Sequence, residues 1–262
     1  MTNIEFQRGA IDAGGCISNA WEMIKQNYGM YLGVAVLAIV LTGCIPCLNL
    51  FLIGPVIGGV FYVVLRNMRG EPVEFGMMFK GFEKFVPLMV IGLIQSIPGI
   101  IAQVIQYGVR FAGLGLNGGR NGDFQFFQAS DRDFALAGGM MVIAIVGSIA
   151  FMIFAFVWWA IFFFAIPLAM EHDLSPVDAI KLSAQAAFAN IGGLIVLLIF
   201  QVLVVLLGLV MVCIGVFLIS IPIIYAANAF AYRQVFPWIE QRFNMAPPPP
   251  TAYGDFGSGM PS

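Results

Sequence analysis

The stretch "ALAGGMMVIAIVGSIAFMIFAFVWWAIFFFAIPLAM" occupies residues 135–170 and contains no charged side chain. About 20 apolar residues in an α-helix cross a bilayer core that is about 30 Å thick. Because this stretch is longer, we expect a helix that tilts, protrudes from the bilayer or bends near Pro167. The stretch therefore predicts an integral membrane protein.

The composition of the whole chain agrees with this prediction. Hydrophobic residues make up 60% of the chain and charged residues 10%, whereas a soluble domain has about 25% charged residues. The net charge of −2 gives no reason to expect nucleic acid as a partner. The hydrophobic composition makes the lipid bilayer the expected partner. The first long apolar run begins at Gly29, so no cleavable signal peptide is expected.

Six apolar runs are long enough, or nearly long enough, to be membrane spans, near residues 29–47, 50–65, 86–109, 136–165, 191–213 and 216–236. An even number of spans places both termini on the same side. That side collects Arg8, Lys25, Arg66, Arg69, Lys80, Lys84, Lys181, Arg233 and Arg242, against Arg110, Arg120 and Arg132 on the other. Because basic residues concentrate in cytoplasmic segments, both termini are expected in the cytoplasm.

An amphipathic segment precedes each pair of spans. Apolar residues recur at helical spacing in the three segments: Ile17, Trp21, Ile24 and Tyr28; Phe75, Met78, Phe79, Phe82 and Phe85; Val177, Ile180, Ala184, Ala187 and Ile191. Ser175, followed by Pro176 and Asp178, is typical of a helix N-terminus. Such helices lie flat at a membrane interface, with Trp21, Phe79, Phe82 and Ile180 as the expected anchors. The predicted fold is all-α, with six transmembrane helices forming three hairpins, each preceded by a cytoplasmic interfacial helix.

Three regions follow from this pattern: an N-terminal cytoplasmic segment (1–14), a membrane domain (15–236) and a tail (237–262). Within the membrane domain, residues 113–134 form the expected outer loop. "CLNLFLIGP" (47–55) and "CIGVFLISIP" (213–222) are similar, which indicates an internal repeat of the helix-plus-hairpin unit. The tail contains "PPPP" (247–250) and is expected to be disordered, with a protein partner able to dock on it.

Three segments resemble one broad family of bacterial inner-membrane proteins: "AWEMIKQNYGMYLGVAV" (20–36), "GPVIGGVFYVVLRNMRGEPVEFGMMFKGFEKFVPL" (54–88) and "IPLAMEHDLSPVDAIKLSAQAAFANIGGLI" (166–195). This family of largely uncharacterised proteins includes the membrane domain attached to some glycerophosphodiester phosphodiesterases. The resemblance implies a six-span core in the inner membrane. It does not imply enzymatic activity, because the catalytic barrel of those enzymes is a separate domain with no counterpart in this chain.

Polar side chains form stripes on three predicted spans. Gln95, Gln103, Gln106 and Arg110 fall within an arc of about 80° on the third span, Tyr225, Asn228 and Tyr232 lie on the sixth, and Gln201 lies on the fifth. Such stripes are unfavourable against lipid, so they should face protein or water. Two interpretations remain open: a path for a polar solute or lipid headgroup, and contacts between helices. The second is favoured, because interhelical amide contacts are common in membranes.

Two further groups of reactive side chains each have a functional and a structural interpretation. Cys44 and Cys47 form a Cys-x-x-Cys pair at an outer turn, and Cys213 has the equivalent place in the repeat. They fit an outward dithiol or disulfide, but packing at a turn is favoured. Glu171-His172-Asp173 fits a metal site, but a solvated loop is favoured.

The sequence contains no phosphate-binding glycine loop and no nucleophile beside a base, so neither a cofactor nor an enzymatic activity is expected. The leading hypothesis is a non-enzymatic membrane protein that organises or senses the bilayer, or serves as an accessory subunit of a membrane complex. One alternative is a passive transporter or translocator of a small polar solute or lipid. Another is an outer-face thiol oxidoreductase that uses Cys44.

Overall fold

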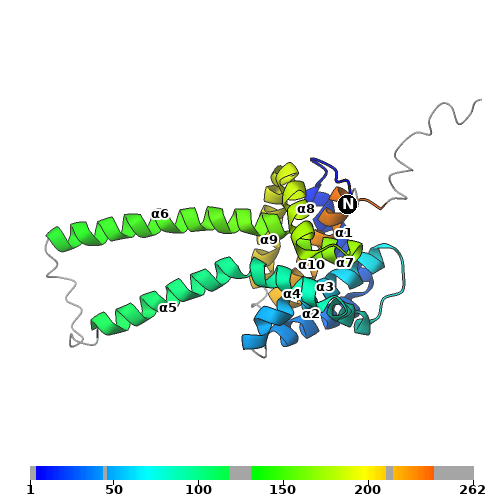
Figure 1. The fold of residues 1–262 in the computed structure, drawn as a ribbon, viewed down its shortest axis with the longest axis horizontal. Helices are drawn as coiled ribbons and strands as arrows, with labels where there is room; N and C mark the ends of the chain where they lie inside the picture. Colours follow the sequence, from blue (N-terminus) through cyan, green and yellow to red (C-terminus); the bar gives the residue numbers. More distant parts are fainter. Residues whose placement is uncertain (1–3, 44–45, 118–130, 211–214, 239–262) are drawn as a thin grey trace, which may run out of the picture.

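The computed structural model describes residues 4–43, 46–117, 131–210 and 215–238, and all regular secondary structure in these ranges is helical (Figure 1). The helices are α1 (Ala13–Gln26), α2 (Tyr28–Gly43), α3 (Pro46–Met68), the 3-10 helix η1 (Phe75–Phe82), α4 (Phe85–Gln95), α5 (Ile97–Asn117), α6 (Asp131–Phe162), α7 (Ala165–His172), α8 (Pro176–Ala189), α9 (Ile191–Val210), the π-helix η2 (Val216–Ser220) and α10 (Ile221–Val235). The predicted all-α fold is confirmed.

Four helical segments are long and apolar enough to cross a membrane: Asn49–Met68, Val142–His172, Ile191–Val210 and Val216–Val235. Two bent pairs raise the number to six if each pair is one span. The pair α1 and α2 is bent by 103°, and the pair α4 and α5 by 45°. The described residues therefore contain four to six candidate membrane spans, and the predicted six agree with the upper value.

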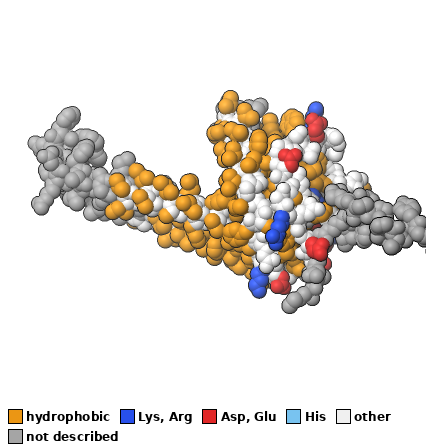
Figure 2. Space-filling model, turned by 90° about the horizontal axis from the view of Figure 1, so that it is seen from above, with side chains coloured by type: hydrophobic (Ala, Val, Ile, Leu, Met, Phe, Trp, Pro, Cys, Tyr) orange, Lys and Arg blue, Asp and Glu red, His pale blue; other side chains and the backbone are white. Residues whose placement is uncertain are grey.

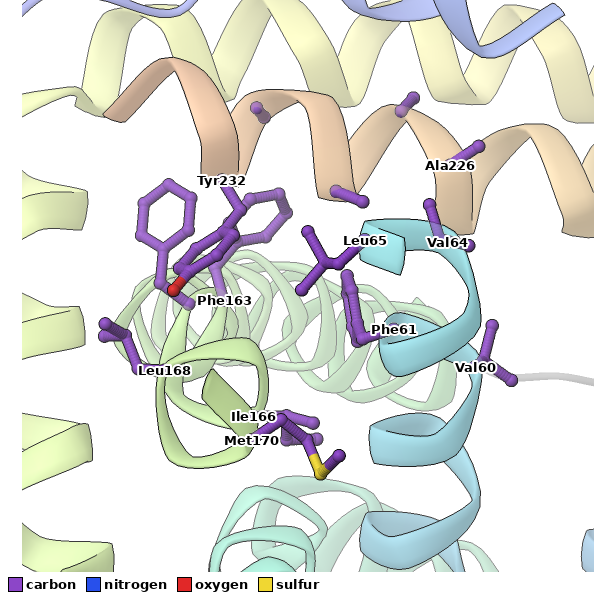
Figure 3. Packing of buried hydrophobic residues seen from close by; sticks show 14 of the residues in the cluster. Val60, Phe61, Val64, Leu65, Phe163, Ile166, Leu168, Met170, Ala226 and Tyr232 are labelled. Atoms are coloured by element: carbon purple, nitrogen blue, oxygen red, sulfur yellow. The ribbon is translucent and has the colours of Figure 1, made fainter. Parts of the chain in front are cut away.

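Helix α3 is the centre of the packed region, and glycines allow its neighbours to come close. A methyl group on Gly54 would overlap the carbonyl oxygen of Leu88 in α4, and one on Gly59 would overlap the carbonyl oxygen of Met78 in η1. At these positions only a residue without a Cβ fits. The side chains of α3, α7 and α10 then fill one space, with Leu65, Met170 and Tyr232 among them (Figure 3).

The long apolar run 135–170 is broken between α6 and α7, at Phe163 and Phe164. This break in the helix lies one turn before Pro167, because proline cannot donate to the carbonyl four residues before it and its ring clashes there. Ser183 of α8 satisfies the backbone at the break. Its hydroxyl accepts a hydrogen bond from Phe164 N (3.0 Å) and donates one to the carbonyl of Ile161 (2.6 Å).

Helices α5 and α6 project together from the rest of the molecule (Figure 1), and we call them the arm. Large apolar side chains on both helices are strongly exposed, with 73% of Phe111 and 73% of Ile143 accessible. Figure 2 shows that hydrophobic side chains cover the arm, while Lys, Arg, Asp and Glu gather at the other end of the molecule. The predicted outer loop 113–134 is too long at both ends, because α5 continues to Asn117 and α6 starts at Asp131.

The three predicted amphipathic segments are helical, and each buries only one of the apolar residues named above: Ile24, Met78 and Ala187. In α1 the buried residues are Ala13, Cys16, Ala20 and Ile24, so Ile24 alone belongs to the expected set, while Trp21 and Tyr28 are exposed. This face of α1 packs against α9 and α10. In α8 the buried residues are Ala179, Ser183, Ala186 and Ala187, and Ile180 is half-buried. The predicted start of α8 is confirmed, because Ser175 Oγ accepts a hydrogen bond from Asp178 N (3.2 Å) and Pro176 is the first helical residue.

The segment before α4 is a 3-10 helix and not the predicted α-helix. Gly81 of this helix lies so close to Pro55 and Gly59 of α3 that a Cβ would overlap their backbone. The contact with α3 therefore determines its geometry more than its own periodicity does. Phe79 is exposed and Phe82 is half-buried between the rings of Phe79 and Phe85.

Candidate functional site

Glu171, at the end of α7, is the centre of a charged cluster. Its Oε1 accepts hydrogen bonds from Arg233 Nη2 (2.5 Å) and Arg69 Nη2 (2.8 Å), and its Oε2 accepts one from the Tyr232 hydroxyl (2.7 Å). The side chains of Glu171 and Arg233 are 14% and 8% exposed, whereas Arg69 is 44% exposed. The carboxylate thus holds one buried and one accessible guanidinium group.

The cluster forms where three candidate spans end. Arg69 follows α3, Glu171 is in the last turn of α7 and Arg233 is in the last turn of α10. Basic side chains at a helix C-terminus also interact favourably with the unpaired carbonyl groups there. The meeting of three C-terminal ends explains why these charges lie together although they are far apart in the sequence.

Two aromatic rings cover the guanidinium of Arg233. Its central carbon lies 4.5 Å from the ring centroid of Trp238 and 5.1 Å from that of Tyr232, and Arg69 lies 5.6 Å from Trp238. These distances are typical of cation–π contacts. Trp238, which was expected to belong to a disordered tail, therefore packs on the bundle.

A cavity of about 170 Å³ opens beside the cluster. Its lining consists of Tyr62, Leu65, Arg66, Arg69, Glu71, Met170, Glu171 and Arg233. Arg66 Nη1 donates to the Tyr62 hydroxyl (3.1 Å), and Arg66 Nε forms an ion pair with Glu71 (2.9 Å) that lacks hydrogen-bond geometry. On the other side of Arg233, a wider groove of about 700 Å³ lies between α1, α3 and α10 and includes Trp238.

A lysine from outside α7, Lys84, binds the C-terminal end of that helix. Lys84 Nζ donates to the carbonyl of Met170 (2.6 Å) and forms an ion pair with Asp173. Asp173 has a left-handed backbone conformation (φ 50°) and ends the helix. The hydrogen bond from Lys84, together with its charge, lowers the pKa of Asp173.

The interpretation of Glu171-His172-Asp173 as a solvated loop is therefore wrong for Glu171. Its partners Arg233 and Arg69 are 62 and 102 residues away, so no local pattern reveals them. One signal was present: Glu171 directly follows the apolar run that ends at Met170, and Arg69 lies four residues after the run that ends at Leu65. In the described part of the chain, no group of three or more His, Cys, Asp and Glu side chains is arranged to hold a metal ion.

The structure brings together only part of the predicted polar stripes. Gln201 Nε2 of α9 donates to Asn228 Oδ1 of α10 (2.6 Å), which is a contact between helices. Tyr225 packs edge-on against Phe61 and lines a cavity of about 10 Å³. A cavity of this volume holds about one water molecule and cannot pass a solute.

The stripe on the third predicted span lies elsewhere. Gln103 and Gln106 are exposed on the arm, whereas Gln95 is half-buried and its carbonyl accepts a hydrogen bond from Trp158 Nε1 (3.3 Å). The side chain of Arg110 lies outside the described residues. The described side chains of this stripe and of the α10 stripe therefore do not line a common cavity among those given above.

The predicted cysteine site falls mainly outside the described residues. Cys44 and Cys213 belong to the ranges that are not described, and Cys47 is described only as part of the α3 backbone. The dithiol, disulfide and turn-packing interpretations remain predictions. Cys16 is a buried free thiol whose Sγ lies 3.4 Å from Gln234 Oε1.

Comparison with known proteins gives distant relatives. No family model matches the chain, and no solved structure matches it. Uncharacterized protein Rv2560 of Mycobacterium tuberculosis and uncharacterized protein Mb2590 of Mycobacterium bovis are each 27% identical to it over 112 residues, which is 42% of this chain and 34% of theirs. The chain thus spans about a third of the length of these relatives, and their names assign them no activity.

Proposed function

We propose that this chain is a non-enzymatic integral membrane protein that organises or senses the bilayer, or serves as an accessory subunit of a membrane complex. The main observation behind this proposal is the exposed apolar surface of the arm. Its exposed apolar side chains include Val104, Phe111, Ile143 and Met152, each more than half accessible. Exposure to water would cost about 25 cal/mol for every Å² of this surface. The arm therefore requires lipid or another protein around it.

The charged cluster supports the detailed topology of three hairpins. In such a topology the second, fourth and sixth spans all end on the side of the N-terminus. The C-terminal ends of α3, α7 and α10 meet at Glu171, and the N-terminal segment lies nearby, with Gln7 N donating to the carbonyl of Val235 (2.9 Å). Together with the distribution of basic residues, this favours six spans with both termini in the cytoplasm.

Two further features support interfacial helices, and we propose the inner membrane as their location on the resemblance of the sequence alone. The 103° bend between α1 and α2 would let α1 lie along the interface while α2 enters the bilayer. The exposed Trp21 and Phe79 are suitable interfacial anchors, because aromatic side chains concentrate at that level. The resemblance adds no activity of its own.

The arm also favours contact with protein over contact with lipid alone. Gln103 and Gln106 are exposed on the same helix as the large apolar side chains. Hydrocarbon cannot satisfy an amide, whereas a neighbouring helix can. An amide is both donor and acceptor, so two identical helices satisfy each other about a two-fold axis. We therefore place a second copy of this chain against α5.

The test is the molecular mass of the full chain in native nanodiscs. We expect dimers or larger assemblies for the wild type, and at least a ten-fold weaker association for Q103L/Q106L, since interhelical amide contacts contribute about 0.6–2 kcal/mol each. The matched control is V104L/I105L on the same helix, which should associate as the wild type does. A monomeric wild type would refute self-association, and an equal loss in the control would refute the role assigned to Gln103 and Gln106. A different membrane protein present in constant stoichiometry would instead support the accessory-subunit role.

A further inference from the structure

The cavity beside Glu171 contains more hydrogen-bond donors than acceptors. The guanidinium groups of Arg66, Arg69 and Arg233 offer about fifteen N–H donors together. For these arginines, five pairs of a guanidinium nitrogen and a protein acceptor lie at hydrogen-bond or ion-pair distance. Among the described residues that line the cavity, two carboxylates, Glu71 and Glu171, face the three guanidinium groups, so this lining has one excess positive charge.

One buried donor at this cavity, Nε of Arg233, has no acceptor among the described residues. The indole Nε1 of Trp238 also lacks one, but Trp238 lines only the wider groove. Arg233 lines both the 170 Å³ cavity and the wider groove, and its side chain is more than nine-tenths buried. Buried donors are normally paired. Their presence beside surplus positive charge indicates a ligand that brings several oxygen acceptors and a negative charge.

Glu171 keeps the guanidinium groups in place and has little capacity left for the unpaired donors. Its Oε1 already accepts two hydrogen bonds and its Oε2 one. Glu71 forms its ion pair with Arg66, and neither carboxylate accepts a hydrogen bond from Nε of Arg233. An acceptor from outside these described side chains would satisfy this donor. Planar guanidinium groups bind the oxygens of phosphate particularly well, because one group can donate two parallel hydrogen bonds.

We propose that this cavity binds the phosphodiester headgroup of an anionic phospholipid. It lies at the C-terminal ends of three candidate spans, which is the level where apolar segments meet lipid headgroups. A volume of about 170 Å³ accommodates a phosphate but not a whole lipid, and Leu65 and Met170 give the cavity an apolar side. A phosphodiester carries one negative charge, which matches the one remaining positive charge. This site does not depend on the arm or on self-association.

Binding is tested with the full chain in a neutral detergent, where it can be studied apart from the bilayer. Three probes are compared: short-chain phosphatidylglycerol, the matching diacylglycerol without phosphate, and inorganic phosphate. The readout is the shift of the thermal midpoint with probe concentration, which gives the dissociation constant. We expect saturable binding of phosphatidylglycerol, and at least ten-fold weaker binding of the other two probes.

Two substitutions change donors without removing buried Arg233. R69Q should weaken phosphatidylglycerol binding about ten-fold or more, because it removes a charge-assisted donor. R66Q removes the charge and the guanidinium donors of another arginine that lines the cavity, and should weaken binding several-fold. The matched control is R8Q, because Arg8 is an exposed arginine that does not line the cavity, and it should bind as the wild type does.

Each outcome decides the proposal. Equal binding of diacylglycerol would show that the phosphate is not recognised and would overturn it. Equal binding of inorganic phosphate would keep an oxyanion site but refute the lipid as its source. An unchanged dissociation constant for both R69Q and R66Q would also overturn it, provided that each variant retains the thermal midpoint of a folded protein in the absence of probe.

Discussion

Replacing Glu171 by glutamine tests whether one carboxylate ties three helices together. E171Q preserves the size of the side chain but removes its charge and one of its two acceptor oxygens. Arg233, whose side chain is 8% exposed, then keeps a buried charge without a counterion. Losing one partner of a buried ion pair typically costs about 3–5 kcal/mol.

The two arginines should contribute unequally. Arg69 is 44% exposed, and exposed ion pairs contribute only about 0–1 kcal/mol because water screens them. The amide of E171Q still accepts one hydrogen bond, which recovers part of the loss. We therefore expect E171Q to lower the free energy of unfolding by about 3 kcal/mol, and R69Q by less than about 1 kcal/mol.

The free energy of unfolding can be measured by titrating detergent-solubilised protein with SDS and following tryptophan fluorescence. E22Q is the matched control, because Glu22 is exposed on α1, and it should change stability by less than about 0.5 kcal/mol. In the double variant E171L/R233M both charges are gone, so we expect a loss smaller than the sum of the two single losses by about 2 kcal/mol. Additive losses, or an E171Q effect no larger than that of E22Q, would contradict the role assigned to Glu171.

Three further predictions concern packing, the helix break and pH. G54A should lower the free energy of unfolding by at least about 1–3 kcal/mol, because its methyl group overlaps a backbone carbonyl of α4. The control is G29A, whose methyl group meets open space. It should be neutral or slightly stabilising in the same SDS titration. S183A leaves a backbone N–H at the α6–α7 break without its acceptor and should cost about 1–3 kcal/mol, while S148A on exposed α6 should cost less than about 0.5 kcal/mol. The contact with Lys84 that lowers the pKa of Asp173 stabilises the fold above pH 3.8, the ordinary pKa of this group. This stabilisation is lost as pH falls through the lower pKa of the folded protein. D173N should therefore remove the part of the acid destabilisation that lies at and below pH 3.8. A pH profile of stability that is the same for D173N and the wild type would contradict this assignment.

The positions of the helices could be predicted from the sequence because the necessary information is local. An uninterrupted apolar run is both the signal for a span and the reason for it, so α3, α6 and α9 lie close to the expected residues. The N-cap at Ser175 could also be predicted, since the capping side chain and its partner are three residues apart.

The charged cluster could not be predicted in the same way. The contacts of Glu171 depend on how α7 packs between α3 and α10, and hydrophobic periodicity does not contain this information. Periodicity also does not distinguish an apolar face that meets lipid from one that meets protein. For this reason the sequence predicts the membrane-facing side of α1, with Trp21, but does not reveal the side that packs on the bundle, with Ala20 and Cys16. The 3-10 geometry of η1 similarly depends on glycines of α3 that lie elsewhere in the chain.

The position of Trp238 has a thermodynamic consequence for anything that binds the end of this chain. Its ring contacts both arginines that Glu171 holds, so the junction of three helices and the start of the C-terminal segment share one set of contacts. A protein that captures the segment after Trp238 and pulls the ring away must weaken that junction. By linkage, whatever strengthens the junction must weaken such capture to the same extent. The freedom of the C-terminal segment and the stability of the helix junction are therefore linked quantities, and a change in one must appear in the other.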